Sequence, residues 1–283
     1  MPMLIPLPLT VPETGEVLCP ALLADGAHLV LVDCGYPDSL PLIESAMANL
    51  GLSPAELTEV FITHHDDDHM GALARLCARY PQARVVAGEG EAPYLTGAQK
   101  SLRLCQAEAL QPTLPPEARA WGEAFCRRLA AVEPVPVHQT VADGDLLPWC
   151  GGCRVVATPG HTPGHCSLYL PQLRVLVTGD AAVLEAGAPA VANPHFTLDL
   201  PRAEASLQKL LALDADCWLC YHGGPPPGGP RPGGGAGPSW GPPPGAPPLL
   251  FTCCLYSAAP SCRAASSCSG WDWISPAAML PPA

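Results

Sequence analysis

The chain has 283 residues, a formal net charge of −12 at pH 7 and a hydrophobic content of 48%. The hydrophobic content suffices for a sizeable core, and the acidic balance argues against a nucleic-acid-binding surface. Because no stretch has the apolar length of a transmembrane helix and the proline-broken N-terminus is a poor signal peptide, we expect a cytoplasmic protein without membrane contacts.

The first hundred residues predict strands that alternate with helices. Residues 1–9 are apolar but interrupted by prolines, which is typical of an edge strand. Two more strands are expected over 17–23 and 28–32, joined by a turn at 24–26. The second runs into Asp33, which either supports a site from behind or forms an ordinary turn.

Helical spacing of apolar residues predicts a helix over 38–50, and residues 53–56 have the spacing of a capping box. A short buried strand is expected over 59–63, and an amphipathic helix starts at Met70. Another short strand is expected over 84–87. The residues between the strand at 59–63 and the following helix therefore lie where α/β folds place their chemistry.

Three histidines and three aspartates fall within the seven residues from His64 to Met70. Neighbouring carboxylates repel one another, and packing gives no reason to assemble them. A divalent cation removes this cost, because it keeps carboxylates ionised and imidazoles neutral. The alternative is a solvated acidic loop that caps the next helix near Asp68. The interleaved histidines favour the metal site.

Residues 94–137 differ in character, with helical patches at 99–110 and 116–132 separated by prolines. They predict a helical insertion over the site, whose apolar positions serve either ordinary packing or a substrate pocket. The triplet 143–145, Asp-Gly-Asp, predicts a hairpin-type turn, and a strand is expected over 154–157.

The second informative stretch is 158–165, Thr-Pro-Gly-His-Thr-Pro-Gly-His. Its prolines and glycines predict a rigid loop that presents His161 and His165. A hairpin is expected over 166–178, and Asp180 follows its second strand.

A helix is predicted over 199–213, with Leu210 and Leu211 among its inward-facing leucines. A final apolar strand over 217–221 runs into His222. Beyond residue 224 the composition changes: residues 225–283 are rich first in proline and glycine and then in serine, alanine and cysteine. We expect a folded domain over 1–224 and a disordered tail; a frame-shifted reading of a GC-rich gene is a second hypothesis for the tail.

Of the 14 cysteines, the scattered ones before residue 225, such as Cys77, Cys105 and Cys126, fall on apolar helix faces and are expected to be small buried hydrophobes. A disulfide framework is not expected in a large cytoplasmic chain. Two C-x-x-C pairs, Cys150/Cys153 and Cys217/Cys220, allow a zinc ribbon, but they lie far apart in the sequence, which argues against it.

The motifs His64-x-Asp66-x-Asp68-His69, Thr-Pro-Gly-His161, Thr-Gly-Asp180 and Tyr-His222-Gly-Gly line up in order. Over residues 1–224 they resemble those of the metallo-β-lactamase-fold hydrolase superfamily. The resemblance implies an α+β fold, a four-layer αββα sandwich with metals at one edge. It also departs from the common His-x-His-x-Asp-His motif, because Asp66 replaces the second histidine.

The resemblance implies two divalent metal ions. Zinc is the first choice and iron or manganese the alternatives, because the Asp66 carboxylate hardens its site. The implied ligand sets are His64, Asp66 and His161 for one ion, and Asp68, His69 and His222 for the other, with Asp180 bridging both. His65 and Asp67 are expected to face solvent or lie behind the ligands, His165 to steady its loop, and His28, His138 and His195 to be structural or exposed.

The implied reaction is hydrolysis of a small ester, lactone or thioester by hydroxide that the two metals generate from water. Asp68 also orients the nucleophile; Tyr94, Tyr221 and His195 are candidate proton donors. Two alternatives stay open. One is a mononuclear-iron oxidoreductase of the same fold, resembling persulfide dioxygenases, and the other is a non-catalytic or truncated metal-binding protein. The expected partner is a small-molecule substrate, and the sequence leaves the oligomeric state open.

Overall fold

The computed structural model describes residues 1–185, 188–194 and 196–222. The predictions for the tail at 225–283 and for His195 lie outside the described residues. The chain divides into two compact units. Among the described residues, the larger unit contains 1–101 and the later part from 132 onward, and the smaller contains 102–131.

The N-terminal half of the larger unit builds a six-stranded sheet in the order β1-β4-β5-β6-β7-β8. The first three strands pair antiparallel, and β5 to β8 pair parallel. Between β1 and β4 in the sequence, β2 and β3 form a separate small antiparallel hairpin. The strands are β1 (Met3–Pro6), β2 (Leu9–Thr10), β3 (Val17–Leu18), β4 (Ala21–Ala24), β5 (Leu29–Val32), β6 (Glu59–Ile62), β7 (Arg84–Gly88) and β8 (Gln139–Val141).

The C-terminal half builds a five-stranded sheet in the order β15-β12-β11-β10-β9. Its neighbours pair antiparallel except for β12 and β15, which are parallel. Strands β13 and β14 form a separate hairpin. The strands are β9 (Leu146–Leu147), β10 (Cys153–Ala157), β11 (Cys166–Leu170), β12 (Val175–Val177), β13 (Val183–Glu185), β14 (Ala188–Ala190) and β15 (Cys217–Leu219).

The turn at 143–145 connects β8 of one sheet to β9 of the other, so the hairpin prediction was wrong. The turn itself closes as expected, since the Asp145 N–H donates to the Ala142 carbonyl at 3.2 Å. Its flanking strands diverge, however, and each pairs with a different neighbour.

The two sheets pack face to face around an apolar core. Alternate residues of the strands supply it: Val30 and Val32 of β5 and Val155 of β10 point into this core. Phe61 of β6 meets Trp149, which lies between β9 and β10, edge-to-face with ring centroids 6.1 Å apart. Burial of these side chains supplies the main driving force for joining the sheets.

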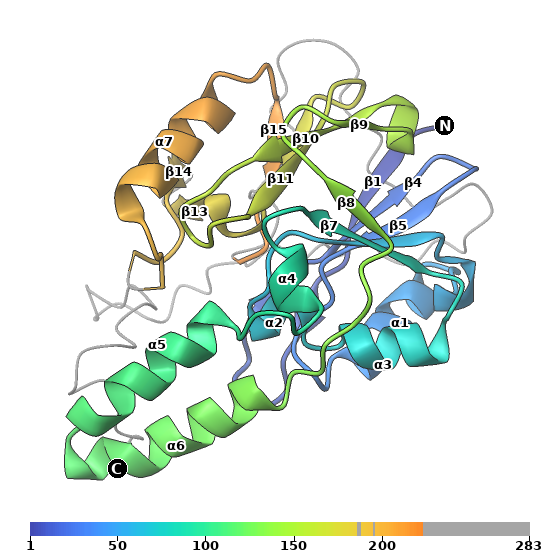
Figure 1. Cartoon of the computed structure of the whole chain (residues 1–283). Helices are drawn as coiled ribbons and strands as arrows, with labels where there is room; N and C mark the ends of the chain where they lie inside the picture. The colour runs from blue at the N-terminus through green and yellow to red at the C-terminus, as the bar shows by residue number, and fades with distance from the viewer. Residues whose placement is uncertain (186–187, 195, 223–283) are drawn as a thin grey trace, which may run out of the picture. The chain divides into compact units, whose positions relative to one another are not determined.

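Helices cover the outer face of each sheet (Figure 1). Ile43 of α1 and Leu76 of α3 pack with Leu31 on the outside of the six-stranded sheet. Leu210 of α7 packs on the outside of the five-stranded sheet, whereas Leu211 is 46% exposed and its predicted burial was wrong. The predicted αββα sandwich is thereby confirmed. The helices and helical turns of this unit are α1 (Leu40–Asn49), η1 (Pro54–Glu56), α2 (Asp67–Met70), α3 (Leu73–Arg79), α4 (Ala92–Leu95), η3 (Trp149–Gly151), η4 (Gly179–Ala181) and α7 (Leu200–Leu211).

The smaller unit is a helical hairpin of α5 (Leu102–Leu110), η2 (Gln111–Thr113) and α6 (Pro116–Ala130). It has its own small cluster of buried residues, Leu104, Ala107 and Leu129. The two predicted helices are confirmed, and their predicted position over the site stays a prediction. Within the described part of the chain, no helix combines the length and apolar character needed to cross a membrane.

Candidate metal centre

The predicted ligands lie at the carboxyl ends of strands that share a direction. β5, β6 and β7 are parallel, and β10, β12 and β15 share one direction in the other sheet. Carboxyl ends of such strands meet at one edge, where α/β folds place their sites. The predicted ligands that follow these strands are His64, Asp66, Asp68 and His69 after β6, His161 after β10, Asp180 after β12 and His222 after β15.

The structure brings all seven of these side chains together in interlocking groups. Asp66 Oδ2 lies 3.6 Å from His64 Nε2 and 3.1 Å from His161 Nε2. Asp68 Oδ2 lies 3.8 Å from His69 Nε2 and 3.2 Å from His222 Nε2. These are the two trios that the sequence predicts as ligand sets.

Asp180 lies between the two trios and faces both. Its Oδ2 is 3.5 Å from His161 Nε2, in the first trio. Its Oδ1 is 3.3 Å from His69 Nε2 and 3.5 Å from His222 Nε2, in the second. One carboxylate oxygen for each group is the arrangement that a bridging ligand requires.

Asp33 fixes the orientation and tautomer of two of these histidines. Its Oδ2 accepts from His69 Nδ1 at 2.9 Å and from Thr63 Oγ1 at 2.8 Å, and its Oδ1 accepts from the Thr63 N–H. Because the Thr63 hydroxyl donates to Asp33, it accepts from His64 Nδ1 at 3.0 Å. In its neutral form each ring is therefore protonated on Nδ1 and turns an Nε2 lone pair into the site.

Asp33 occupies a left-handed backbone conformation, with φ of 61°. Such conformations are strained for most residues but tolerated by aspartate. Of the two sequence interpretations of Asp33, support of the site from behind is confirmed.

Buried polar atoms test whether these residues fit a metal. The Nε2 atoms of His64 and His69 and the Oδ1 atom of Asp180 are buried and accept no hydrogen bond. Leaving buried polar atoms unsatisfied is costly, and a cation coordinated by these atoms removes that cost. The donor set of imidazole nitrogens and carboxylate oxygens fits divalent metal ions.

The electrostatics of the cluster agree with this fit. Burial alone would lower the pKa of His69 and of His222, but the Asp180 carboxylate and its neighbours raise both well above the usual value. Burial would raise the pKa of Asp180, yet His222 and His69 hold it well below its usual range. The carboxylates thus stay ionised and attract positive charge, which a metal ion provides.

His165 steadies its loop, as predicted. The Asp180 N–H donates to His165 Nε2 at 3.0 Å, so the ring is protonated on Nδ1, which donates to Thr158 Oγ1 at 2.8 Å. Burial lowers the pKa of His165 to about 3, which keeps the ring neutral and able to accept. The ring therefore ties the loop that carries His161 to the backbone of Asp180.

Two residues predicted to face solvent or lie behind the ligands are both buried: His65 is 3% and Asp67 is 6% exposed. His65 Nδ1 donates to Glu91, a residue that the sequence analysis missed. Glu91 follows β7 in the sequence Gly-Glu-Gly-Glu. The sequence feature that could have identified it is its position just after a strand that is parallel to β6.

Two of the candidate proton donors, Tyr221 and Tyr94, lie among the described residues. The buried Tyr221 hydroxyl donates to the Asp68 carbonyl at 2.6 Å and accepts from the Gly35 N–H, and burial raises its pKa well above the usual value. The Tyr221 hydroxyl proton is thus shared with the Asp68 carbonyl, and the candidate role of Tyr221 as a proton donor stays a prediction. Tyr94 stacks on His65 with ring centroids 4.2 Å apart.

Among the described residues, His28, His138 and the two C-x-x-C pairs lie outside the groups that could hold a metal. His28 bonds to Asp25, and His138 Nδ1 accepts from the Val85 N–H, as expected of structural histidines. Among the described residues, the groups able to hold a metal contain histidine and aspartate and no cysteine. The zinc-ribbon alternative therefore gains no support. Its four thiols, Cys150, Cys153, Cys217 and Cys220, are buried, whereas Cys105 is exposed, so the predicted burial of Cys105 was wrong.

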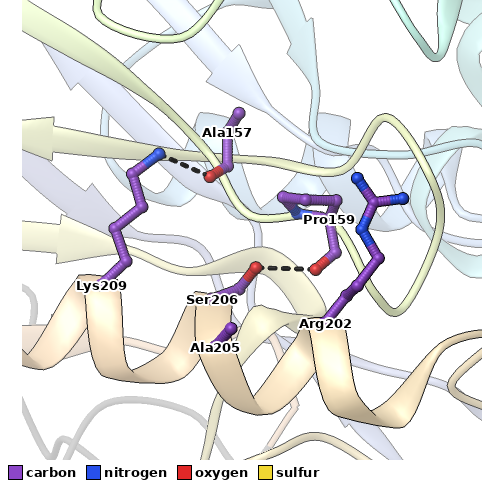
Figure 2. A pocket seen from close by; sticks show the side chains of 6 residues that line it. All are labelled: Ala157, Pro159, Arg202, Ala205, Ser206 and Lys209. Atoms are coloured by element: carbon purple, nitrogen blue, oxygen red, sulfur yellow. Dashed lines mark hydrogen bonds between the residues drawn. The ribbon is translucent and has the colours of Figure 1, made fainter.

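A pocket of about 290 Å³ lies where α7 faces the end of β10 (Figure 2). The Ser206 hydroxyl donates to the Pro159 carbonyl at 2.6 Å, and Lys209 Nζ donates to the Ala157 carbonyl at 2.9 Å. These bonds hold the start of the His161 loop against α7. The lining residues are Ala157, Pro159, Arg202, Ala205, Ser206 and Lys209, so the pocket contains none of the predicted ligands.

Known proteins resemble the chain over this same region. The probable metallo-hydrolase YflN of Bacillus subtilis is 28% identical over 214 residues, which are 69% of this chain and 75% of YflN. A hydroxyacylglutathione hydrolase of Aeromonas hydrophila is 27% identical over 199 residues, covering 69% of this chain but only 57% of the relative.

A solved metallo-beta-lactamase family protein of Thermus thermophilus superposes with a TM-score of 0.63 at 27% identity, covering 79% of this chain and 74% of that one. The family model described as the metallo-beta-lactamase superfamily matches residues 15–222, which include every predicted ligand. With its sandwich fold and its cluster of histidines and aspartates at one edge, the chain belongs to the metallo-beta-lactamase superfamily.

Proposed function

We propose that the protein is a hydrolase that holds two divalent metal ions, zinc first, and cleaves a small ester, lactone or thioester. The observation that carries this proposal is the position of Asp180, with one carboxylate oxygen toward each trio. Similarity to a probable metallo-hydrolase supports metal-dependent hydrolysis, and similarity to a hydroxyacylglutathione hydrolase supports an acyl substrate.

One ion would be held by His64, Asp66 and His161, the other by Asp68, His69 and His222, and Asp180 would serve both. When bound, such ions polarise a substrate oxygen and lower the pKa of water to near neutrality. No separate protein nucleophile is then required, which agrees with the absence of a Gly-x-Ser-x-Gly motif from residues 1–224 of the sequence.

Asp68 is the proposed catalytic residue beyond its ligand role. Burial would raise its pKa, but His69 and His222 hold it below its usual range, so the carboxylate is ionised. An ionised carboxylate accepts hydrogen bonds and donates none. Asp68 therefore orients an attacking water by accepting a hydrogen bond from it.

Elemental analysis combined with a panel of lactone, thioester and phosphodiester substrates tests this function. We expect two zinc ions per chain and turnover of an ester, lactone or thioester that disappears after chelation and returns with the metal. His69→Ala should abolish both the binding of an ion by the trio of Asp68, His69 and His222 and the hydrolytic activity. His28→Ala, a histidine outside the cluster, is the matched control and should leave both intact. Turnover that survives both chelation and His69→Ala would reject the mechanism.

A second candidate function rests on His64, Asp66 and His161, which form a two-histidine, one-carboxylate set. This set is typical of mononuclear iron oxygenases. One iron per chain, with oxygen consumption in place of hydrolysis, would favour an oxidoreductase. Metal binding without turnover of any kind would favour a non-catalytic metal-binding protein.

A further inference from the structure

A carboxylate outside the ligand cluster connects the two loops that carry the first trio. Glu91 is fully buried. Its Oε2 accepts from the His65 N–H at 3.0 Å and from His65 Nδ1. Its Oε1 accepts from Thr162 Oγ1 at 2.7 Å and from the Gly164 N–H at 2.9 Å. One oxygen thus serves the loop after β6, and the other serves the loop after β10.

The four hydrogen bonds explain how a carboxylate is tolerated without exposure to water. A buried carboxylate is costly unless its lone pairs are satisfied, and here each oxygen has two donors. If one loop moved away, Glu91 could no longer satisfy the donors of both loops. Replacing the carboxylate by a group with fewer acceptors would likewise leave buried donors unsatisfied. The contact therefore resists changes in the distance between the loops.

The backbones of the two segments also meet directly beside Glu91. A Cβ atom on Gly164 would lie 2.3 Å from the Gly90 carbonyl carbon, and one on Gly90 would lie 2.8 Å from Gly164 Cα. Only glycine allows such an approach. The contact between the loops is thus both steric and polar.

Three of the four donors belong to residues that are next to predicted metal ligands in the sequence. His65 stands between His64 and Asp66, and Thr162 follows His161. All three neighbours belong to the first trio. The second trio has other supports: Asp33 holds His69, and Glu16 Oε1 lies 3.3 Å from His222 Nδ1.

We propose that Glu91 is a positioning residue that sets the separation of Asp66 and His161 and so controls metal affinity at the first trio alone. The proposal rests on the proposed function, because it assumes that each trio holds an ion. It assigns to Glu91 a selective role that a general contribution to stability would not produce.

Stepwise metal release to a chromophoric chelator tests the proposal with Glu91→Gln. The glutamine amide keeps the shape of the side chain but turns an NH2 group toward one pair of donors. We expect one of the two ions to be released at least about tenfold more readily and the other to keep its wild-type affinity. Thr162→Val, which removes a single donor, should weaken the same site to a smaller extent and keeps the test open if Glu91→Gln fails to fold.

Glu89→Gln is the matched control, since Glu89 is exposed and lies two residues away; it should release both ions as the wild type does. Equal weakening of both ions in Glu91→Gln, or retention of both with wild-type affinity, would overturn the positioning role. A wild-type protein that binds fewer than two ions would instead overturn the proposed function, so the two failures can be told apart.

Discussion

Replacing Asp33 by asparagine tests how the site is supported from behind. The buried carboxylate accepts three hydrogen bonds, two from Thr63 and one from His69. An asparagine of the same shape can accept on only one side. Its NH2 group must face either the Thr63 N–H or His69 Nδ1, so one buried pair becomes donor against donor.

The size of the effect follows from these bonds. Losing a hydrogen bond to a charged group costs about 1.5–3 kcal/mol, and an unsatisfied buried donor costs about 1–3 kcal/mol. Because the losses overlap, we expect Asp33→Asn to lower the free energy of unfolding by about 2–4 kcal/mol. If the amide faces His69, the imidazole proton moves to Nε2 and blocks its lone pair, which should weaken metal binding about 10–100-fold.

Urea unfolding in the presence of a chelator measures the first effect without metal linkage, and chelator competition measures the second. Asp38→Asn is the control, because the Asp38 side chain is 89% exposed and its partner among the described residues is the exposed Arg75; its cost should stay below about 1 kcal/mol. If Asp33→Asn matched this control in stability and bound metal as the wild type does, the support assigned to Asp33 would be refuted.

Two further predictions concern α7. Leu210→Ala should cost about 2–5 kcal/mol in urea unfolding because its side chain is buried, whereas Leu211→Ala should stay within about 0.5 kcal/mol; equal costs would contradict the observed face. Burial raises the pKa of Asp143, but hydrogen bonds from Lys209 Nζ and the Ala157 N–H leave it below the ordinary 3.8. The pKa of Asp143 is thus lower in the folded than in the unfolded protein, so the ionised carboxylate stabilises the fold at pH 7. Asp143→Asn should therefore destabilise the protein at pH 7. The difference from wild type should fade as the pH drops below 3.8, and a difference that grew in acid would contradict this sign.

The side chains that cluster at the site could be predicted from the sequence because each carries its own local signal. Three neighbouring aspartates among histidines, a histidine in a Pro-Gly loop and an aspartate after an apolar strand are unusual wherever they occur. The alternation of apolar residues likewise predicts the strands, because the two-residue period reflects a local geometry.

What the sequence could not predict depends on tertiary approach. In the sequence, Glu91 is an ordinary glutamate in a glycine-rich turn. Its role depends on Thr162 and Gly164, which lie in the loop after β10 and contact it in the folded structure. Leu211 continues the apolar run of α7, but the helix has turned its side chain past the sheet by that residue. At 143–145 the turn chemistry was read correctly, while the separation of its flanking strands depends on which sheet each one joins.

The division of the ligands between the sheets has a consequence for unfolding. His64, Asp66, Asp68 and His69 follow a strand of the six-stranded sheet, and His161, Asp180 and His222 follow strands of the five-stranded sheet. Ions held there would cross-link the halves of the sandwich, because each trio takes its side chains from segments that follow strands of both sheets. Amide hydrogen exchange should then slow in both sheets together when metal is added, since neither half can open without releasing the ions.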